Sequence, residues 1–312
     1  MATSDWKSGQ AWAAPPITGH TRVVGVMAWP VTHTQSPPMH NAAYAAAGLE
    51  LIYVAFPVAP ERVGEAVRGA RALGLLGINV TIPHKQAVIP FLDELSIEAG
   101  ACGSVNTIQI LDNGRLVGHS TDGFGFLKSL EMDAGYSPED QKVVLVGTGG
   151  AGRAMAVSLA LGGARSLVLL NRTESKRAEL ASVLEGLVSK SGRPGARPVQ
   201  ISHADPLSGA AREALDEADL IVNATSLGMK PSDPTPVDPQ RLRPGQFVYD
   251  TIYTPAETRL LQEARRRGCR TLGGLGMLAY QGARAVEIWT GRWPDAELMK
   301  RVLARNLGVD PA

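Results

Sequence analysis

Lys85 is the first residue whose surroundings suggest chemistry. The stretch Gly77–Ile82 is typical of a strand. Asn79, Thr81 and Lys85 fall on alternate positions of this stretch and of the residues after it. Polar side chains within a core strand are costly unless they bind something, and α/β folds bind ligands beyond the carboxyl ends of their strands. A lysine there can stabilise a developing negative charge or supply a proton, although a lone lysine is more often a surface cation.

A carboxylate, that of Asp122, follows a predicted hairpin. The strands expected at Asn106–Leu111 and Arg115–Thr121 flank an Asn113-Gly114 pair, which is a strong hairpin signal. A two-residue turn there places the first residue of one strand opposite the last residue of the other. The open end of the hairpin then brings Asn106 and Asp122 together.

A glycine-rich run follows the apolar stretch Lys142–Val146 and precedes a helical stretch. It matches G-x-G-x-x-G, in which the glycines permit a tight turn, close approach of a pyrophosphate and close helix packing. The helix N-terminus adds free N–H groups for the phosphates. We therefore expect a dinucleotide site rather than a glycine-rich turn that merely packs. The expected contacts are Gly147, Gly149, Gly150, Ala151 and Gly152.

The next predicted strand indicates which dinucleotide binds. NAD-binding domains usually place Asp or Glu at its end, to hold the ribose 2′-hydroxyl. Here that position holds Asn171-Arg172-Thr173, with Lys176 one turn further on. Arg172 and Lys176 could pair with a 2′-phosphate, which a carboxylate would repel. The expected cofactor is NADP(H), and the plainer alternative is a solvated basic start of a helix.

The elements that must position these residues alternate between strands and helices, which predicts an α/β fold with parallel sheets. We expect an N-terminal α/β substrate domain and a C-terminal Rossmann-type dinucleotide-binding domain, with C-terminal helices returning to the first domain. The expected bounds are 1–121 with 275–312 for the first domain and 122–274 for the second. The nucleotide domain should hold five strands, namely Lys142–Val146, Ser166–Leu170, Pro198–Ile201, Asp219–Asn223 and Phe247–Asp250. Further expected elements are helices at Phe124–Ala134 and Leu278–Leu307 and a surface loop at Ser189–Pro198.

Composition excludes several classes of protein. The 312 residues carry 31 Lys+Arg and 30 Asp+Glu, so charge gives no case for a nucleic-acid partner. No stretch is apolar enough to span a membrane, and residues 1–17 lack the apolar core of a secretion signal, so we expect a cytoplasmic protein. The two cysteines form no CxxC pair, and His33, His40 and His84 lack ligand spacing, so no metal is expected.

The run Asn79–Lys85 (NVTIPHK) resembles the catalytic strand motif of shikimate dehydrogenases. Other runs resemble that family's landmarks in the same order, from about Gly19 to Trp289. They are Ser36–Asn41 (SPPMHN), Ser104–Thr107 (SVNT), Ser120–Gly123 (STDG), Gly147–Gly152, Asn171–Thr173, Asn223–Met229 (NATSLGM), Asp250–Pro255 (DTIYTP) and Gly274–Gln281 (GLGMLAYQ). Any one of these motifs is modest evidence, and the ordered set is specific.

The resemblance implies an enzyme that reversibly reduces 3-dehydroshikimate to shikimate with NADPH, in aromatic amino acid biosynthesis. Lys85 and Asp122 would be the catalytic pair. Thr34 and Ser36 would hold the substrate carboxylate. The ring hydroxyls would be read by Asn79, Thr81, Asn106, Tyr253 and Gln281. Thr225, Ser226, Gly274 and Met277 would add to the cofactor site. The partner would be a small molecule, with neither nucleic acid nor membrane, and the protein would act as a monomer or homodimer.

Two positions depart from the common family pattern, with Thr34 in place of serine and Ser120 in place of asparagine. The methyl group of Thr34 alters the carboxylate pocket, so a quinate/shikimate dehydrogenase using NAD is an alternative. The basic Arg172 weighs against that alternative. A non-catalytic metabolite sensor is a remote alternative, because Lys85 and Asp122 are both present and no helix-turn-helix is recognisable.

Overall fold

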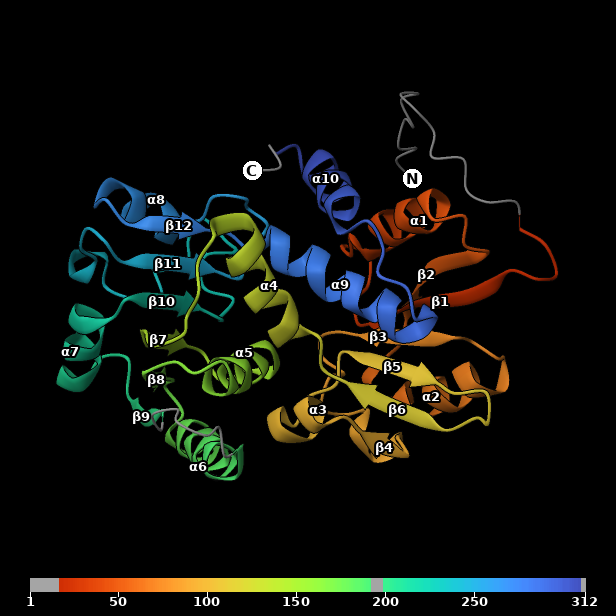
Figure 1. The fold of residues 1–312 in the computed structure, drawn as a ribbon, viewed down its shortest axis with the longest axis horizontal. Coiled ribbons are helices and arrows are strands. Elements are labelled where there is room, and N and C mark those ends of the chain that lie inside the picture. The colour runs from red at the N-terminus through yellow and green to blue at the C-terminus, as the bar shows by residue number, and fades with distance from the viewer. Residues whose placement is uncertain (1–16, 192–198, 310–312) are drawn as a thin grey trace.

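A computed structural model describes residues 17–191 and 199–309, and the N-terminal stretch 1–17, in which no secretion signal was expected, lies almost wholly outside them. Two six-stranded sheets stand side by side, each with its own helices (Figure 1). Helices α4 (Asp122–Ala134) and α9 (Leu275–Thr290) pack against each other between the two sheets. This packing brings residues that follow strands of the first sheet close to residues that follow strands of the second sheet.

The first sheet has the strand order β2-β1-β3-β5-β6-β4. The strands are β1 (Arg22–Ala28), β2 (Leu51–Pro57), β3 (Gly77–Val80), β4 (Glu94–Leu95), β5 (Thr107–Ile110) and β6 (Leu116–His119). β1, β2 and β3 are parallel, whereas β5 is antiparallel to β3 and β6. The accompanying helices are α1 (Ser36–Ala46), α2 (Val63–Ala72) and α3 (Ile97–Cys102), with 3₁₀ turns at Pro60–Arg62 and Ile89–Phe91.

The second sheet is entirely parallel, with the order β12-β11-β10-β7-β8-β9. Its strands are β7 (Lys142–Val146), β8 (Ser166–Leu170), β9 (Gln200–Ala204), β10 (Leu220–Asn223), β11 (Phe247–Asp250) and β12 (Arg270–Leu272). Its helices are α5 (Gly150–Leu161), α6 (Glu174–Ser191), α7 (Gly209–Glu217) and α8 (Arg259–Arg266), with a 3₁₀ turn at Pro239–Arg241. This is the Rossmann order, which reverses between β7 and β10, and ligands bind at that switch point.

Burial explains why the second sheet takes this form. β10 and β11 are buried along their whole length, as expected of parallel strands covered on both faces. One apolar cluster, which includes Leu145 and Met155, covers one face, and another, which includes Val144 and Ile221, covers the opposite face. The glycine loop after β7 is therefore held by a strand buried in the centre of the sheet.

The C-terminal helices α9 and α10 (Ala296–Leu307) pack on elements of the first sheet. Met39 of α1 shares an apolar cluster with Ala283 of α9 and Met299 of α10. Trp289 of α9 donates a hydrogen bond from Nε1 to the Ile108 carbonyl at 3.0 Å. A Cβ at residue 77 would lie 2.0 Å from that Nε1, so the close approach of the helix requires a glycine there.

The structure corrects several expected element bounds. The hairpin turn is not the two-residue turn predicted at Asn113-Gly114, because Thr107 pairs with His119 and Ile110 with Leu116. The Gly114 N–H bonds to the Leu111 carbonyl and Gly114 has φ +79°, which is a three-residue loop with a left-handed last residue. The register therefore shifts by one residue, so Thr121 does not lie opposite the first residue of the other predicted strand.

Other differences lie at element ends. The second sheet holds a sixth strand, β12, whereas five strands were expected. β3 ends at Val80, before the expected Ile82, and α4 begins at Asp122, before the expected Phe124. Helix α6 extends to Ser191, so the loop predicted for Ser189–Pro198 is helical at its start. The rest of that loop, residues 192–198, lies outside the described residues.

Candidate active site

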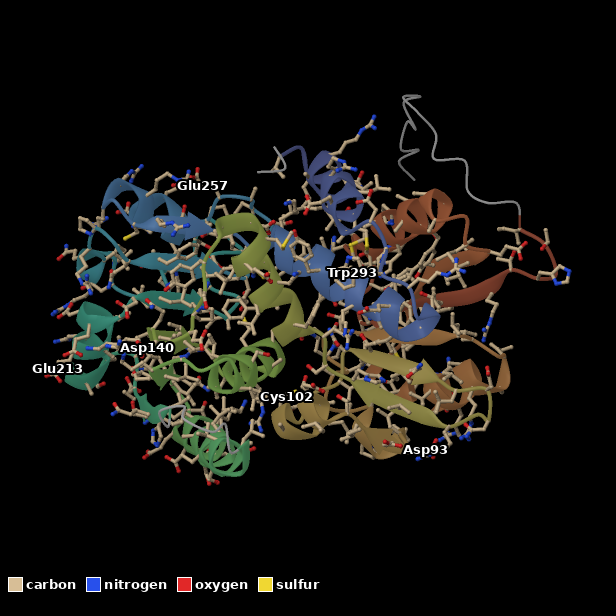
Figure 2. All side chains as sticks on the ribbon, viewed as in Figure 1. Asp93, Cys102, Asp140, Glu213, Glu257 and Trp293 are labelled. Atoms are coloured by element: carbon tan, nitrogen blue, oxygen red, sulfur yellow. The ribbon has the colours of Figure 1, made fainter. Side chains whose placement is uncertain are left out.

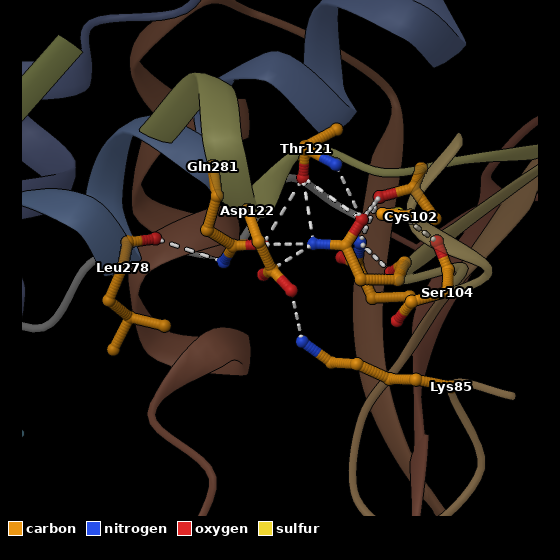
Figure 3. Close-up of polar contacts among 10 residues, drawn as sticks. Lys85, Cys102, Ser104, Thr121, Asp122, Leu278 and Gln281 are labelled. Carbon is orange, nitrogen blue, oxygen red and sulfur yellow. Dashed lines mark hydrogen bonds and ion pairs between the residues drawn. The ribbon is translucent and has the colours of Figure 1, made fainter. Parts of the chain in front are cut away.

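Lys85 and Asp122 form an ion pair where the two sheets meet (Figure 3). Lys85 lies in the turn after β3, and Asp122 is the first residue of α4. The distance from Lys85 Nζ to Asp122 Oδ2 is 2.5 Å, and the two side chains are 17% and 7% exposed. Shielding from water strengthens the mutual attraction of the two charges and holds the ammonium in a fixed place.

Asn106 holds the aspartate of this pair in place. Its Nδ2 donates to Asp122 Oδ1 at 2.9 Å and to Thr121 Oγ1 at 2.9 Å, and it lies 3.2 Å from Gln281 Oε1 (Figure 3). Its Oδ1 accepts from the Thr121 N–H at 2.8 Å. The two oxygens of Asp122 thus have separate donors, since Lys85 serves Oδ2 and Asn106 serves Oδ1.

Asn79 extends the network along the first sheet. Its Nδ2 donates to the Asn106 carbonyl at 3.1 Å and to Thr107 Oγ1 at 2.9 Å. Its Oδ1 accepts from the Tyr53 hydroxyl at 2.8 Å. Tyr53, Thr107 and Thr121 were not among the candidates, because a tyrosine or threonine in or beside a strand is usually a packing residue.

The remaining substrate candidates are placed around this network. Ser36 is 9% exposed and begins α1, and its N–H donates to Thr34 Oγ1 at 3.3 Å. Pro37 and Pro38 follow Ser36 and carry no N–H, so the hydroxyl groups of Thr34 and Ser36 are the donors that this helix start can offer a carboxylate. Lys85, Asp122, Asn106 and Gln281 are linked by hydrogen bonds. In the described chain, no hydrogen bond joins the side chain of Thr81 or Tyr253 to this group. Burial raises the pKa of Tyr253 above its usual value.

The glycine loop faces Lys85 from the second sheet. A Cβ added at Gly150 would lie 3.5 Å from Lys85 Cδ and 3.0 Å from Ser104 Oγ. Gly147 has φ +100°, and a Cβ at Gly152 would lie 2.2 Å from the Gly147 carbonyl oxygen. A Cβ at Gly149 would meet no atom within 4 Å. The loop thus needs glycine for its turn and its packing, and it leaves open space where a pyrophosphate would approach.

We call each sheet with its own helices a lobe. A second contact between the two lobes lies beside this loop. Arg153 of α5 is 8% exposed and donates from Nε to the Cys102 carbonyl, at the end of α3, at 2.6 Å. Its Nη1 forms an ion pair with Glu179 of α6 at 3.1 Å. Figure 2 marks Cys102 where the two lobes meet. The helix that carries the glycine loop is thus tied to the first sheet.

The other cofactor candidates surround the loop or lie beyond it. Asn171 donates to Thr148 of the loop, while Arg172, Thr173 and Lys176 are exposed. A Cβ at Gly147 would lie 2.8 Å from Thr225 Cγ2, and Ser226 is exposed. Gly274 caps α9, where a Cβ would lie 2.0 Å from the Thr251 carbonyl oxygen, and Met277 is buried in an apolar cluster of the second sheet.

Two of the candidate histidines, His40 and His84, each have one local hydrogen-bond partner. His40 Nδ1 lies 2.9 Å from the Ser36 carbonyl, and His84 Nε2 lies 2.8 Å from the Val58 carbonyl. Burial lowers the pKa of His40 to about 4, so the ring is neutral at physiological pH. Within the described ranges, no three His, Cys, Asp or Glu side chains gather closely enough to hold a metal ion.

A dinucleotide loop at a topological switch point, opposite a lysine–aspartate pair, defines a nicotinamide-dependent oxidoreductase. The family model described as the shikimate dehydrogenase substrate binding domain matches residues 26–108. The model described as the shikimate 5'-dehydrogenase C-terminal domain matches residues 274–304. The chain is 47% identical over 294 residues to a protein from Moorella thermoacetica named shikimate dehydrogenase (NADP(+)), covering 94% of this chain and 96% of the relative. The chain belongs to the shikimate dehydrogenase family.

Solved structures agree with this assignment. A shikimate dehydrogenase in complex with NADP+ has a TM-score of 0.84 and 40% identity, and the match covers 95% of this chain and 99% of that one. A quinate dehydrogenase from Corynebacterium glutamicum in complex with NAD has a TM-score of 0.81 and 31% identity, covering 91% and 99%. None of the helices in the described part of the chain is long and apolar enough to cross a membrane.

Proposed function

We propose that the chain reversibly reduces 3-dehydroshikimate to shikimate with NADPH, a step of aromatic amino acid biosynthesis. One observation carries the proposal. The Lys85–Asp122 pair, built by the first sheet and α4, lies against the glycine loop of the second sheet, with Lys85 Cδ 3.5 Å from a Cβ position at Gly150. When bound, NADPH supplies the hydride for the ketone carbon, and the loop is placed to hold its pyrophosphate.

The protein's own part in the reaction is to manage the proton and the developing charge. Lys85 Nζ is placed to hold the proton that the carbonyl oxygen takes up as it becomes a hydroxyl. Asp122 Oδ2 fixes the position of the ammonium at 2.5 Å. Asn106 orients the aspartate through Oδ1 at 2.9 Å. In the oxidative direction, the same lysine–aspartate pair accepts the proton of the hydroxyl.

The substrate side is assigned to the first lobe. Thr34 and Ser36, at the start of α1, hold the carboxylate. The ring hydroxyls are read by Asn79, Thr81, Asn106, Tyr253 and Gln281. Accordingly, residues 1–121 and 275–312 form the substrate-binding domain, and residues 122–274 form the NADP-binding domain. The packing of α9 and α10 on α1 supports the return of the C-terminal helices to the first domain.

The cofactor side is assigned to the second lobe. The pyrophosphate lies on Gly147–Gly152, and the 2′-phosphate lies near Asn171, Arg172, Thr173 and Lys176. Arg172 follows β8 and Lys176 lies in the first turn of α6, and both side chains are exposed, so they can reorient toward a phosphate. The nicotinamide half lies near Thr225, Ser226, Gly274 and Met277. The contact of Thr225 with the Gly147 turn supports this placement.

The experiment that tests the proposal is a spectrophotometric assay at the absorbance of the reduced cofactor. Purified protein is given shikimate or quinate, each with NADP or with NAD. A strong preference for shikimate with NADP is the expected result. Equal or faster turnover of quinate, especially with NAD, would move the chain to quinate oxidation and contradict the role given to Arg172. No turnover of any pair would contradict an enzymatic function.

The assembly and compartment complete the proposal. The protein acts on a small molecule in the cytoplasm, as a monomer or a homodimer. The near balance of 31 basic and 30 acidic residues agrees with the absence of a nucleic-acid partner. Sedimentation at the concentration of the assay distinguishes the monomer from the dimer.

A further inference from the structure

Tyr53 is a buried polar residue that the proposed reaction has not yet used. It lies in β2, it is 1% exposed, and its hydroxyl donates to Asn79 Oδ1 at 2.8 Å. Its backbone is held by the Asn41 side chain of α1, through bonds of 2.9 and 2.8 Å. Its ring stacks on the His40 imidazole with centroids 4.0 Å apart and planes 15° apart. These contacts to the backbone and the ring of Tyr53 therefore hold its hydroxyl group against Asn79.

The hydrogen bonds of Asn79 show what this orientation of the Tyr53 hydroxyl achieves. The Asn106 carbonyl can only accept a hydrogen bond, so the atom of Asn79 that faces it at 3.1 Å must be Nδ2. The second N–H of that amide goes to Thr107 Oγ1 at 2.9 Å. The Tyr53 hydroxyl takes one of the two acceptor positions of Oδ1. The one position left open on the Asn79 amide is therefore an acceptor.

We propose that Tyr53 is a positioning residue for substrate recognition, which fixes the Asn79 amide so that it accepts a hydrogen bond from a substrate hydroxyl. The inference rests on the proposed function, since it takes Asn79 as a reader of the ring hydroxyls. Without the phenol, Oδ1 loses the donor that holds it in place. A group that only accepts hydrogen bonds finds no partner at this position, which makes it a place where the site selects a hydroxyl.

Tyr44 provides a matched control for the loss of a buried hydroxyl. It is also fully buried, and its ring lies 6.0 Å from the same histidine, His40. Its hydroxyl has no hydrogen-bond partner in the described chain. Tyr44→Phe and Tyr53→Phe therefore remove the same atom from neighbouring places, and only the second substitution takes a partner from Asn79.

The test measures kcat and KM for shikimate and for NADP in the unaltered protein, Tyr44→Phe, Tyr53→Phe, Asn79→Ala and the double variant Tyr53→Phe/Asn79→Ala. Tyr53→Phe keeps the stacked ring and is expected to raise the KM for shikimate about two- to tenfold. Its kcat and its KM for NADP should stay within about twofold of the starting values, which separates positioning from a general loss of structure. In the Asn79→Ala background the same change should have no further effect on KM.

The outcomes separate the inference from the proposed function. An unaltered KM in an active Tyr53→Phe protein overturns the inference alone. An equal rise of KM in Tyr44→Phe, or an undiminished rise in the Asn79→Ala background, overturns it as well, because the phenol would then act by another route. If the unaltered protein does not oxidise shikimate, the proposed function falls and the inference falls with it.

Discussion

Replacing Lys85 by methionine is the most direct test of the proposed chemistry. Methionine keeps the unbranched stem that lies beside Gly150 and removes only the ammonium group that pairs with Asp122. The side chains of the pair are 17% and 7% exposed, so a water molecule or a buffer cation would replace the ammonium poorly. A positioned proton donor contributes about 10²–10⁴ in rate. We therefore expect kcat to fall at least about 100-fold, which is a rise of about 2.7 kcal/mol in the activation barrier.

The assay follows the reduced cofactor at saturating NADP while shikimate is varied. Asp122→Asn and the double variant Lys85→Met/Asp122→Asn complete a cycle. Because the two residues act as one unit, the combined loss should be smaller than the product of the single losses. Lys128→Met is the control, since Lys128 also lies close to Asp122 in the chain but pairs with the exposed Glu131 at 3.0 Å. That control should keep its full kcat.

Two results would contradict the assignment of Lys85. If kcat is maintained in Lys85→Met and only the KM for shikimate rises, the lysine binds the substrate and supplies no proton. If the single losses multiply in the double variant, Lys85 and Asp122 work independently, and the short contact between them is structural.

Three further predictions concern the cofactor and the stability of the protein. Arg172→Gln should weaken NADPH roughly tenfold and NADH far less, whereas equal weakening in titrations of both cofactors would place the 2′-phosphate elsewhere. Gly152→Ala puts a Cβ 2.2 Å from the Gly147 carbonyl oxygen, so the dissociation constant of NADPH should rise about tenfold or more, while Gly186→Ala, with no atom within 4 Å of its Cβ, should bind normally. Burial lowers the pKa of His40 from 6.5 to about 4, so its contribution to stability is complete above pH 6.5. That contribution is lost by about 1.4 kcal/mol per pH unit as the pH falls toward 4, because only the unfolded chain takes up the proton. Urea unfolding at pH 7 and pH 5 should show this loss in the unaltered protein and a smaller loss in His40→Gln, and an equal loss in both would refute it.

Local chemistry explains why much of the cofactor half could be predicted. The strand Lys142–Val146, the tight turn of the glycine run after it and the presence of a helix next in the chain are confirmed, because each depends on its own residues. A parallel strand buried on both faces must be continuously apolar, and a turn this tight must contain glycine. The approach of Asn106 to Asp122 is also confirmed, with a bond of 2.9 Å.

The remaining features depend on contacts between distant segments. The turn at Asn113-Gly114 was wrong because Gly114 fits either a two-residue turn or the last place of a three-residue loop. β12 was missed because Arg270–Leu272 is too short to show the pattern of apolar and polar residues that marks a strand. Tyr53 looked like an ordinary core aromatic, and its bond to Asn79 joins residues 26 positions apart. Sequence periodicity carries no information on such a partner.

The lysine–aspartate pair and the glycine loop come from different sheets, and this origin has an evolutionary consequence. In the proposed assignment, proton handling belongs to residues in the turn after β3 and at the start of α4, whereas the choice of dinucleotide belongs to residues that follow β8. A substitution near Arg172 can change the redox partner without disturbing the hydrogen bonds around Asp122. The two properties can therefore drift separately, so descendants of one ancestral gene can exchange one dinucleotide for another while inheriting the acid–base apparatus intact.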